Sequence, residues 1–434
     1  MITKAKGTID LVGLEAKKWQ YVNKVIDALM EKYNYDFIRT PIFESRELFY
    51  RGVGEASDIV SKETYDFLDR GNREMTLRPE GTAGVVRALI ENKLYANTSS
   101  AIKLYYNGTM YRYERPQAGR DREFTQFGVE VFGSYSPAID AEVISVAVNL
   151  LKLLGLQGIK VRLNSLGDLS SQESYREALN KYFKKHLKEL CDDCNNRYEK
   201  NVLRILDCKV DANSKIIKEA PKTIDYLNEE SKKHFDAVVA YLKTMDIDFE
   251  IDTTVVRGLD YYTDIVFEVE ASVEGFGANN TLIGGGRYNN LVKSLGGPEI
   301  PGVGFALGIG RLVRALELEE IELDLDLENE IYILNVSQTE REYAITLGQY
   351  LRMQGYRVSI NYEDKSLKAQ FKDADRESSK YLIILNDKDL ENDEVVVKNN
   401  KTKEEEKIML DYLVYYLDEQ LNLEGEYDEE IHEH

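Results

Sequence analysis

Residues 102–132 read IKLYYNGTMYRYERPQAGRDREFTQFGVEVF, and this stretch says most about the fold. Two β-rich segments, 102–113 and 126–132, flank a polar and basic segment that contains Gly and Pro. We predict two strands joined by a loop of about a dozen residues, and a hairpin loop of that length usually carries function. The stretch therefore indicates a β-hairpin with a binding site beside it.

Polar side chains fall on one face of each predicted strand. Because side chains alternate along a strand, Gln126 and Glu130 share a face of the second strand. The same alternation places Arg112 and Glu114 together at the end of the first strand. If these faces coincide, they form a floor of one Arg, one Gln and two Glu, which suits an ammonium group, an imidazole or a phosphate. A surface hairpin with ordinary ion pairs is the alternative.

Three other segments carry Arg, Glu or Gly in strand-like or turn-like settings. Residues 75–93 read as a strand, a Pro/Gly turn and a helix, residues 257–268 read as a strand, and residues 302–311 read GVGFALGIGR. Burying an Arg is costly unless the Arg meets an anion or a carboxylate, so several such arginines suggest a polyanionic ligand. The glycine spacing does not match a dinucleotide fingerprint. It suits close approach to a planar ligand, with Arg311 reaching a phosphate, or else tight packing of a helix on a strand.

Composition and charge exclude several classes of protein. The chain has 434 residues, of which 43% are hydrophobic and 31% charged, so it has enough apolar surface for two or three domains. Its formal net charge is −21, but residues 417–434 carry acidic side chains and no Lys or Arg. A local basic surface is therefore compatible with the total charge. We expect a soluble cytoplasmic protein, because the sequence contains neither a long apolar run nor a secretory signal.

The order of the predicted elements indicates distinct regions. A helical, highly charged stretch covers about 170–245, and an acidic segment at 316–329 resembles a linker. From 329 to about 420, strands and helices alternate, which is typical of a small α/β domain with a mainly parallel sheet. Residues 421–434 are expected to be a frayed acidic tail.

Histidine and cysteine give little support for a metal site. The chain has four His, two of them within the last three residues, and it shows neither a Ser/His/Asp set nor a phosphate-binding P-loop. Cys191, Cys194 and Cys208 form a CxxC pair and a third cysteine. Structural zinc normally has four ligands, and no fourth Cys or nearby His follows, although Asp207 or a water would complete the set. We therefore expect free thiols, with zinc unlikely.

Taken together, these segments resemble the histidyl-tRNA synthetases of bacterial type, a family of class II aminoacyl-tRNA synthetases. The resemblance rests on six segments: RTPIFESRELFYRGVG, TLRPEGT, YRYERPQAGRDREFTQFGVEVFG, RGLDYYTDIVFE, GGGRYNNLVKSLGG and GVGFALGIGRL. It implies an α+β catalytic domain over 1–325 with a mainly antiparallel sheet and a helical insertion at about 170–245. It also implies an α/β anticodon-binding domain over 329–420.

The resemblance further implies an activity and its partners. Members of this family are histidine-tRNA ligases, which join histidine to ATP, form histidyl-adenylate and pyrophosphate, and then transfer histidine to the 3′ end of tRNA-His with release of AMP. Mg²⁺ is expected with ATP. A homodimer is expected through the first motif, 39–54, which contains Pro41, and no membrane partner is expected.

Residue roles follow from the same resemblance. Arg112, Arg257 and Arg311 would be catalytic, with Arg257 at the α-phosphate, where other class II enzymes rely on a metal. Arg112, Glu114 and Arg311 would bind ATP. The residues that would bind histidine are Glu80, Gly81, Thr82, Gln126, Glu130, Arg257, Tyr261 and Tyr262, with Glu130 and Tyr262 reading the two imidazole nitrogens.

Two other interpretations stay open from the sequence. One is a synthetase-like regulatory subunit of ATP phosphoribosyltransferase, which does not aminoacylate, and the other is a class II enzyme for another amino acid. Gly310 stands where the family usually has Glu, which would loosen the setting of Arg311 and lower the affinity for ATP.

Overall fold

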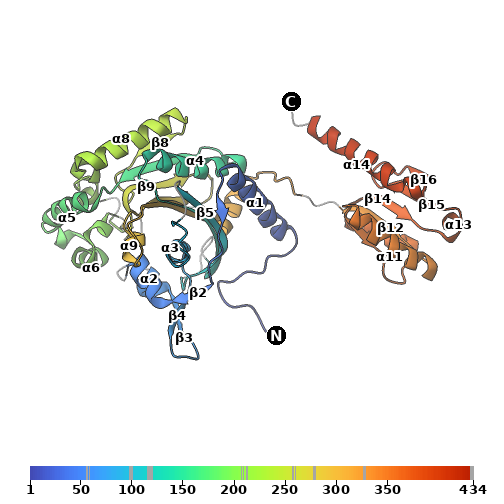
Figure 1. The fold of residues 1–434 in the computed structure, drawn as a ribbon, viewed down its shortest axis with the longest axis horizontal. Coiled ribbons are helices and arrows are strands. Elements are labelled where there is room, and N and C mark those ends of the chain that lie inside the picture. Colours follow the sequence, from blue (N-terminus) through green and yellow to red (C-terminus); the bar gives the residue numbers. More distant parts are fainter. Residues whose placement is uncertain are drawn as a thin grey trace. The chain divides into compact units, whose positions relative to one another are not determined.

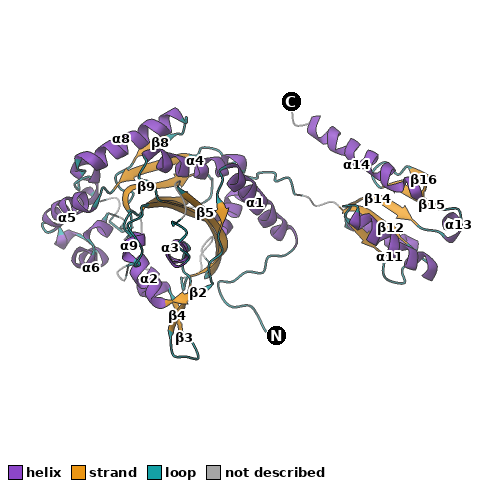
Figure 2. Ribbon diagram, viewed as in Figure 1, coloured by secondary structure: helices purple, strands orange, loops and turns teal. Residues whose placement is uncertain are grey.

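The computed structural model divides into two compact units, Met1–Asp324 and Leu325–His434, which are described separately below. Figures 1 and 2 show their helices and strands. No helix in the part of the chain that the structure describes has the length and apolarity needed to cross a membrane. The described residues are 1–54, 57, 59–96, 101–114, 121–206, 208, 210–211, 214–256, 259, 261–276, 280–325 and 329–430.

An eight-stranded sheet with the order β1-β5-β6-β11-β10-β9-β7-β8 forms the centre of the N-terminal unit. The edge pairs β1/β5 and β7/β8 are parallel, and the pairs between them are antiparallel. The sheet is therefore mainly antiparallel, as the family resemblance implies. Its strands are β1 (Asp36–Phe37), β5 (Ile102–Tyr111), β6 (Glu123–Phe132), β7 (Lys160–Ser165), β8 (Phe249–Ile251), β9 (Thr263–Glu270), β10 (Thr281–Arg287) and β11 (Gly302–Gly308).

The predicted hairpin is present as β5 and β6, although β6 begins earlier than predicted. The register pairs Gly108 with Gln126 and Leu104 with Glu130, so these residues share one face of the sheet. On the opposite face, residues such as Phe127 belong to a large apolar core together with residues of α1, α4 and α10. Because the side-chain period is two, the register decides which side chains of β6 meet this core. The core helices are α1 (Gly13–Lys32), α4 (Pro137–Leu153) and α10 (Ile309–Leu318).

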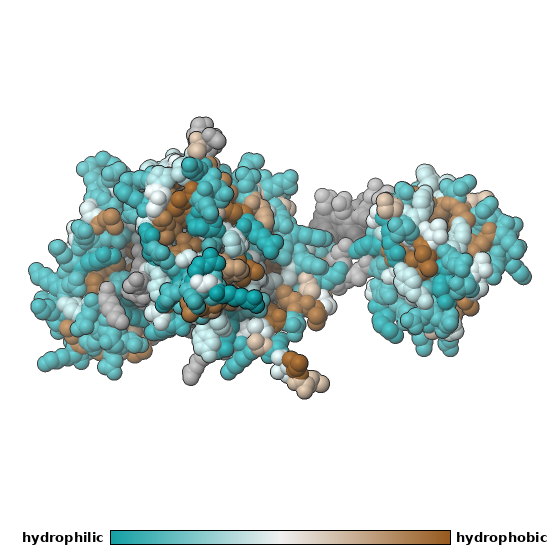
Figure 3. Space-filling model, turned by 60° about the horizontal axis from the view of Figure 1, so that its bottom comes forward, coloured by the Kyte–Doolittle hydropathy of each residue, from teal (hydrophilic) through white to brown (hydrophobic). Residues whose placement is uncertain are grey.

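A small antiparallel sheet with the order β2-β4-β3 lies at the lower end of the N-terminal unit in Figure 1. Phe43 and Phe67 meet edge to face across it, and both are largely exposed. Figure 3 turns the lower side forward and shows brown, apolar residues among the hydrophilic ones. The elements here and next to them are β2 (Phe43–Ser45), β3 (Tyr65–Leu68), β4 (Glu74–Leu77), α2 (Arg46–Val53), η1 (Ile59–Glu63), α3 (Thr82–Glu91) and α9 (Leu291–Ser294).

Two longer helices, α5 and α8, and several short ones occupy the stretch for which the sequence predicts a helical insertion. Side-chain caps explain where two of them begin: Asp168 accepts the Ser171 amide at 2.8 Å, and Asn228 accepts the Ser231 amide at 2.8 Å. Several of the helices are only one or two turns long. They are α5 (Leu169–Phe183), η2 (Leu187–Glu189), α6 (Asp192–Lys200), η3 (Val202–Ile205), α7 (Lys215–Lys218), η4 (Thr223–Tyr226) and α8 (Glu229–Thr244).

The C-terminal unit is an α/β domain with a sheet of its own, in the order β13-β12-β14-β15-β16. The pairs β12/β13 and β12/β14 are parallel, but β14/β15 and β15/β16 are antiparallel. The prediction of a mainly parallel sheet is therefore wrong, because β15 and β16 form a hairpin whose second strand was not predicted. The elements are β12 (Asn329–Leu334), α11 (Gln338–Met353), β13 (Val358–Ile360), α12 (Leu367–Arg376), β14 (Ser379–Ile384), α13 (Asp387–Leu390), β15 (Glu394–Asn399), β16 (Glu405–Met409), η5 (Leu410–Tyr412) and α14 (Leu413–Glu430).

Helix α14 runs through most of the segment that the sequence predicts to be a frayed tail. Its backbone is helical to Glu430, and residues 431–434 lie outside the described residues. Apolar residues at its start, Leu413 and Leu417, are buried in the core of the C-terminal unit. The acidic segment therefore continues a helix whose first turns are held by packing.

A buried ion pair joins β10 to α4 in the N-terminal unit. Arg287, which is fully buried, donates from Nε and Nη2 to the two carboxylate oxygens of Asp140 at 2.8 and 2.7 Å. Its Nη1 donates to the Ser134 carbonyl at 2.9 Å, and His234 Nε2 lies 2.9 Å from Asp140. Such a pair is stable when both charges are present, because bidentate hydrogen bonds replace the lost hydration.

Replacing Asp140 with Ala should leave the Arg287 guanidinium buried without a carboxylate. We expect the free energy of unfolding to fall by about 3–5 kcal/mol. Urea denaturation followed by the fluorescence of Trp19, the single tryptophan and a core residue of this unit, measures the change. The control is Glu299→Ala, which removes the exposed pair with Lys293 and should leave the urea midpoint nearly unchanged, because water screens that pair. Equal midpoints for the two variants would contradict the assignment.

Candidate active site

Glu130 is the most deeply placed polar residue of the predicted site. It lies on β6 and is 1% exposed. Thr82 Oγ1 donates to its Oε1 at 2.7 Å, and the Tyr288 hydroxyl donates to its Oε2. Burial, with a smaller contribution from the Glu80 charge, raises the pKa of Glu130 to about 8, whereas the two hydrogen bonds act in the opposite direction. The carboxyl group is therefore poised to gain or lose a proton near neutral pH.

Glu80 is a second buried carboxyl group, just before the first turn of α3. It accepts the backbone N–H groups of Thr82 at 2.7 Å and Ala83 at 2.8 Å, which otherwise lack intrahelical partners. Burial raises the pKa of Glu80, whereas these two hydrogen bonds act to lower it. The helix start is thereby tied to Glu80 through the Thr82 backbone and to Glu130 through the Thr82 hydroxyl.

Tyrosines surround the two carboxyl groups. The rings of Tyr261 and Tyr262 have centroids 4.7 Å apart, and Tyr261 meets the edge of Tyr288 at 5.6 Å. Burial raises the pKa of Tyr106, Tyr261 and Tyr288 well above 10, and the Glu130 charge raises it further. These phenols therefore remain protonated and available as hydrogen-bond donors.

Two glycines make room for this arrangement. A Cβ on Gly304 of β11 would lie 2.1 Å from Glu130 Oε2, and one on Gly128 would lie 2.4 Å from the ring of Tyr106. No side chain fits at either position without moving a buried polar group. The glycines therefore leave the space in which the Glu130 carboxylate and the Tyr106 phenol lie.

A cleft of 840 Å³ adjoins this buried group, and Arg112, Glu114, Gln126 and Arg311 are among the residues that line it. Arg112 Nε donates to the Pro79 carbonyl at 2.8 Å. Arg311 Nε donates to the Thr281 carbonyl at 2.9 Å. Each of the two arginines is therefore held by a backbone carbonyl. Guanidinium groups fixed in this way favour an anionic ligand.

Arg311 also has an aromatic contact. Its guanidinium carbon lies 4.2 Å from the ring centroid of Phe276, which is within the range of a cation–π interaction. The Arg311 side chain is therefore held both by Thr281 and by Phe276.

Gln126 connects the cleft to the buried group. Its side chain lines the cleft, and its Oε1 accepts the Gly81 amide at 3.1 Å and the Tyr106 hydroxyl at 3.3 Å. Arginines therefore line the cleft itself, and the buried carboxyl and phenol groups lie behind Gln126, outside the cleft lining. Such an arrangement suits a molecule that combines an anionic group with a small polar head.

Most of the predicted site residues lie in these two adjoining regions. Arg257 lies outside the described residues. The sequence analysis missed Tyr106 and Tyr288, although Tyr288 donates a hydrogen bond to Glu130 beside the one from Thr82. The reading of an imidazole by Glu130 and Tyr262 stays a prediction. The sequence analysis also missed Trp19, Arg197 and Arg204 in the wall of the cleft. A usable signal existed only for Tyr106, which faces Gly128 across the predicted hairpin.

Comparisons with known proteins cover nearly the whole chain. A family described as histidyl-tRNA synthetase matches residues 7–312, and one described as anticodon binding domain matches residues 330–420. The histidine-tRNA ligase of Geobacillus sp. (strain WCH70) is 50% identical over 417 residues, which cover 96% of this chain and 99% of that protein. The histidine-tRNA ligase of Anoxybacillus flavithermus is 48% identical over 412 residues, which cover 95% and 97%.

A solved structure shows the same likeness. Apo histidyl-tRNA synthetase from S. aureus matches with a TM-score of 0.83 and 42% sequence identity. The match covers 96% of this chain and 100% of that one. Both the catalytic sheet and the separate C-terminal sheet thus have a counterpart of known structure.

Glu130 should make the stability of the protein depend on pH. Because its pKa in the folded protein, about 8, exceeds the ordinary 4.5, its contribution to stability is fully present below 4.5 and is lost as pH rises through about 8. Glu130→Gln cannot titrate and should escape this loss. We expect the variant to gain about 2–5 kcal/mol relative to the unmodified protein between about pH 5 and pH 9.

Urea midpoints from Trp19 fluorescence across this pH range measure the difference. Glu229→Gln is the control, because the Glu229 side chain is 85% exposed on α8 and water screens its charge. The urea midpoint of Glu229→Gln should change with pH in the same way as that of the unmodified protein. The same pH dependence in Glu130→Gln would refute the raised pKa.

Proposed function

The chain belongs to the histidyl-tRNA synthetase family, and we propose that it activates histidine with ATP and transfers the histidyl group to the 3′ end of tRNA-His. The observation that carries this proposal is the position of Gln126 between the arginine-lined cleft and the buried Glu130 group. An amino acid bound there has its side chain in the buried group and its carboxylate toward the arginines. The enzyme is thus a histidine-tRNA ligase that forms AMP.

Histidine is recognised by the groups around Glu130. An imidazole has one N–H donor and one acceptor nitrogen, so a carboxylate and a phenol together satisfy both. Glu130 takes the donor, and Tyr262 donates to the other nitrogen with Tyr261 beside it. A side chain that leaves either group unpaired is rejected, because an unpaired buried polar group is costly.

The α-amino group of histidine binds near the start of α3. Glu80, Thr82 and Gln126 offer oxygen atoms there, and Gly81, whose Cβ would lie 2.2 Å from the Tyr106 ring, leaves room for that phenol. What supports this placement is the bond of the Gly81 amide to Gln126, which brings the α3 start to the edge of the cleft. The positive ammonium group is also compatible with the two nearby carboxyl groups.

ATP occupies the cleft. Arg112 contacts the α-phosphate and the histidine carboxylate, Glu114 holds the adenine, and Arg311 binds the outer phosphates or stacks on the purine. We expect Arg257, which lies outside the described residues, to stabilise the negative charge that develops on the α-phosphate as the carboxylate attacks. No general base is needed, because the attacking carboxylate is already ionised at neutral pH.

A divalent cation, Mg²⁺, enters with ATP. The carboxylates of Glu123 and Glu268 line the cleft, and carboxylate oxygens are the ligands that Mg²⁺ prefers. The cation neutralises phosphate charge when it is bound.

Gly310 does not prevent Arg311 from acting. Arg311 is held by the Thr281 carbonyl and by Phe276, and neither contact involves residue 310. A Cβ on Gly310 would lie 3.5 Å from Trp19, which is an ordinary contact. The position therefore tolerates a side chain, and its glycine is not what sets the guanidinium.

The tRNA is bound by both units. The C-terminal unit takes the anticodon, which the anticodon binding domain match at 330–420 supports. Arg197 and Arg204 of the insertion line the cleft, where cationic side chains would meet the phosphates of the tRNA 3′ end.

The working form is a homodimer in the cytoplasm, built through the first motif. Exposed apolar side chains on and beside the small sheet support a surface that needs covering. They are Ile42, Phe43, Phe67 and Leu68. We place the protein in the cytoplasm because its substrate is tRNA.

The regulatory-subunit alternative has less support. Relatives at 48–50% identity over nearly the whole chain carry the name histidine-tRNA ligase. The C-terminal unit, which such regulatory paralogues generally lack, is present. Specificity for histidine is the property that separates the three interpretations in an experiment.

ATP–pyrophosphate exchange with each amino acid in turn measures this specificity. We expect incorporation of labelled pyrophosphate into ATP only with histidine, because only its side chain pairs with both Glu130 and a phenol. Exchange with no amino acid would favour the regulatory subunit. Exchange with a different amino acid would indicate another class II enzyme.

Glu130→Gln should weaken histidine binding. Ionised Glu130 makes a charge-assisted hydrogen bond worth about 1.5–3 kcal/mol, so above about pH 8 we expect the Kd to rise roughly 10- to 150-fold. Calorimetric titration with histidine measures this change. The affinity for ATP is the internal control and should stay within about two-fold, because Glu130 does not line the cleft. An unchanged Kd for histidine would mean that the pocket lies elsewhere.

A further inference from the structure

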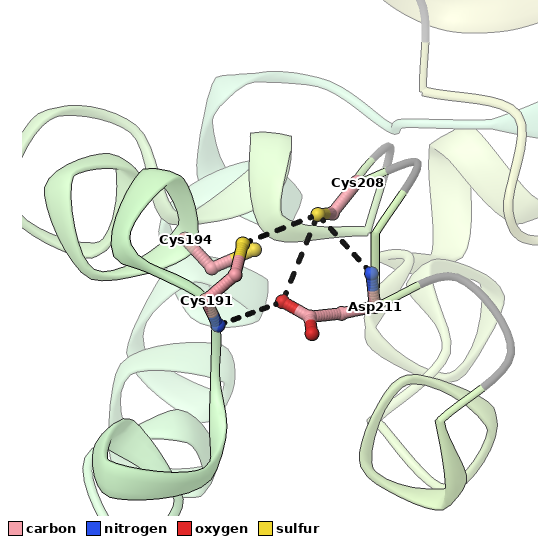
Figure 4. A group of neighbouring side chains, drawn as sticks. All are labelled: Cys191, Cys194, Cys208 and Asp211. Carbon is pink, nitrogen blue, oxygen red and sulfur yellow. Dashed lines mark hydrogen bonds between the residues drawn. The ribbon is translucent and has the colours of Figure 1, made fainter.

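Three cysteines and an aspartate converge in the helical insertion (Figure 4). Cys191 immediately precedes α6, Cys194 lies in its first turn, and Cys208 follows η3. The three sulfur atoms and a carboxylate oxygen of Asp211 all lie within 4.8 Å of one another. Figure 4 shows the four side chains pointing toward a common centre from two separate stretches of chain.

We propose that Cys191, Cys194, Cys208 and Asp211 bind a structural Zn²⁺ ion. Structural zinc is nearly always held by four ligands in a tetrahedron, and thiolates are the most common among them. Two cysteines separated by two residues at a helix start are typical of such sites. The sequence analysis lacked a fourth ligand and considered Asp207, which lies outside the described residues. Asp211 supplies that ligand.

Backbone groups support the negative charge that these ligands carry. The Cys191 amide donates to Asp211 Oδ2 at 3.1 Å, and the Asp211 amide donates to Cys208 Sγ at 3.4 Å. The first bond turns the carboxylate toward the sulfur atoms. Hydrogen bonds of this kind orient metal ligands and stabilise their charged forms.

The contacts do not fit a disulfide. The sulfur atoms of Cys191 and Cys208 are 3.6 Å apart, and a bond between them would leave Cys194 and Asp211 without a role. Packing alone explains the buried thiols of Cys194 and Cys208, because free cysteine behaves as a small apolar residue. It does not explain a carboxylate directed at three sulfur atoms, a donor set that suits a cation such as Zn²⁺.

The ion would add a cross-link to a part of the chain that is built from short helices and packed on a hydrophobic core. The helices from η2 to α7 contain three to nine residues each, too few to be stable alone. A metal joins the start of α6 to the segment after η3. The same piece carries Arg197 and Arg204, whose side chains line the cleft, and Arg197 Nη1 donates to the Arg204 carbonyl at 2.9 Å.

The test is the metal content of the purified full-length chain, produced in zinc-supplemented medium without a metal-binding tag and freed of loosely bound ions. Mass spectrometry of the metals should find about one zinc per chain. Asp211→Asn and Cys208→Ser should lose most of it. The control is Asp193→Asn, an exposed acid in the same segment with the same change of charge, and it should keep the full content.

A second measurement uses Co²⁺, which takes up tetrahedral thiolate sites and absorbs visible light there. The unmodified chain, stripped with a chelator and reloaded with Co²⁺, should show these bands, and Asp211→Asn should shift or lose them. The proposal is overturned by zinc-free protein, by a Cys191–Cys208 disulfide in peptide mapping, or by full zinc content in Asp211→Asn. None of these readouts depends on aminoacylation, so the outcome is independent of the proposed function.

Discussion

The need to satisfy a carboxyl group buried against a β-sheet shapes the N-terminal unit. Glu130 lies on a central strand with almost no access to water, and an isolated charge there would be prohibitively costly. Its two oxygen atoms therefore take donors from the start of α3 and from the segment after β10. These bonds bring together parts of the chain that are far apart in sequence, and the adjoining cleft follows from where they meet.

Periodicity and spacing are enough to predict the main features of this arrangement. Alternation places Gln126 and Glu130 on one face, and the observed register brings Gly108 and Leu104 opposite them. The turn before α3 is predictable because Pro, Gly and Thr mark a helix start. The family resemblance adds the mainly antiparallel sheet and the second domain, which local patterns do not reveal by themselves.

What the sequence does not reveal depends on long-range geometry. Tyr288 donates to Glu130 across 158 positions of the chain, and Asp211 reaches Cys191 across 20, and no local pattern encodes either approach. Strand β16 reads EEKIM and lies at the solvent-exposed edge of the C-terminal sheet. Its residues are therefore mostly polar, and the sequence does not look like a strand. Contacts between residues far apart in the chain determine these features, so short stretches of sequence do not predict them.

The alternation of side chains along β6 also determines which mutations the protein tolerates. Exchanging one amino acid for another alters a single contact, but adding or deleting one codon between Gln126 and Glu130 would reverse the facing of every residue beyond it. Valine and phenylalanine would then enter the carboxyl pocket, and the carboxylate would enter the apolar core. We therefore expect the length of this segment to vary less than its residue types, and we expect insertions and deletions of whole codons to be confined to the surface loops.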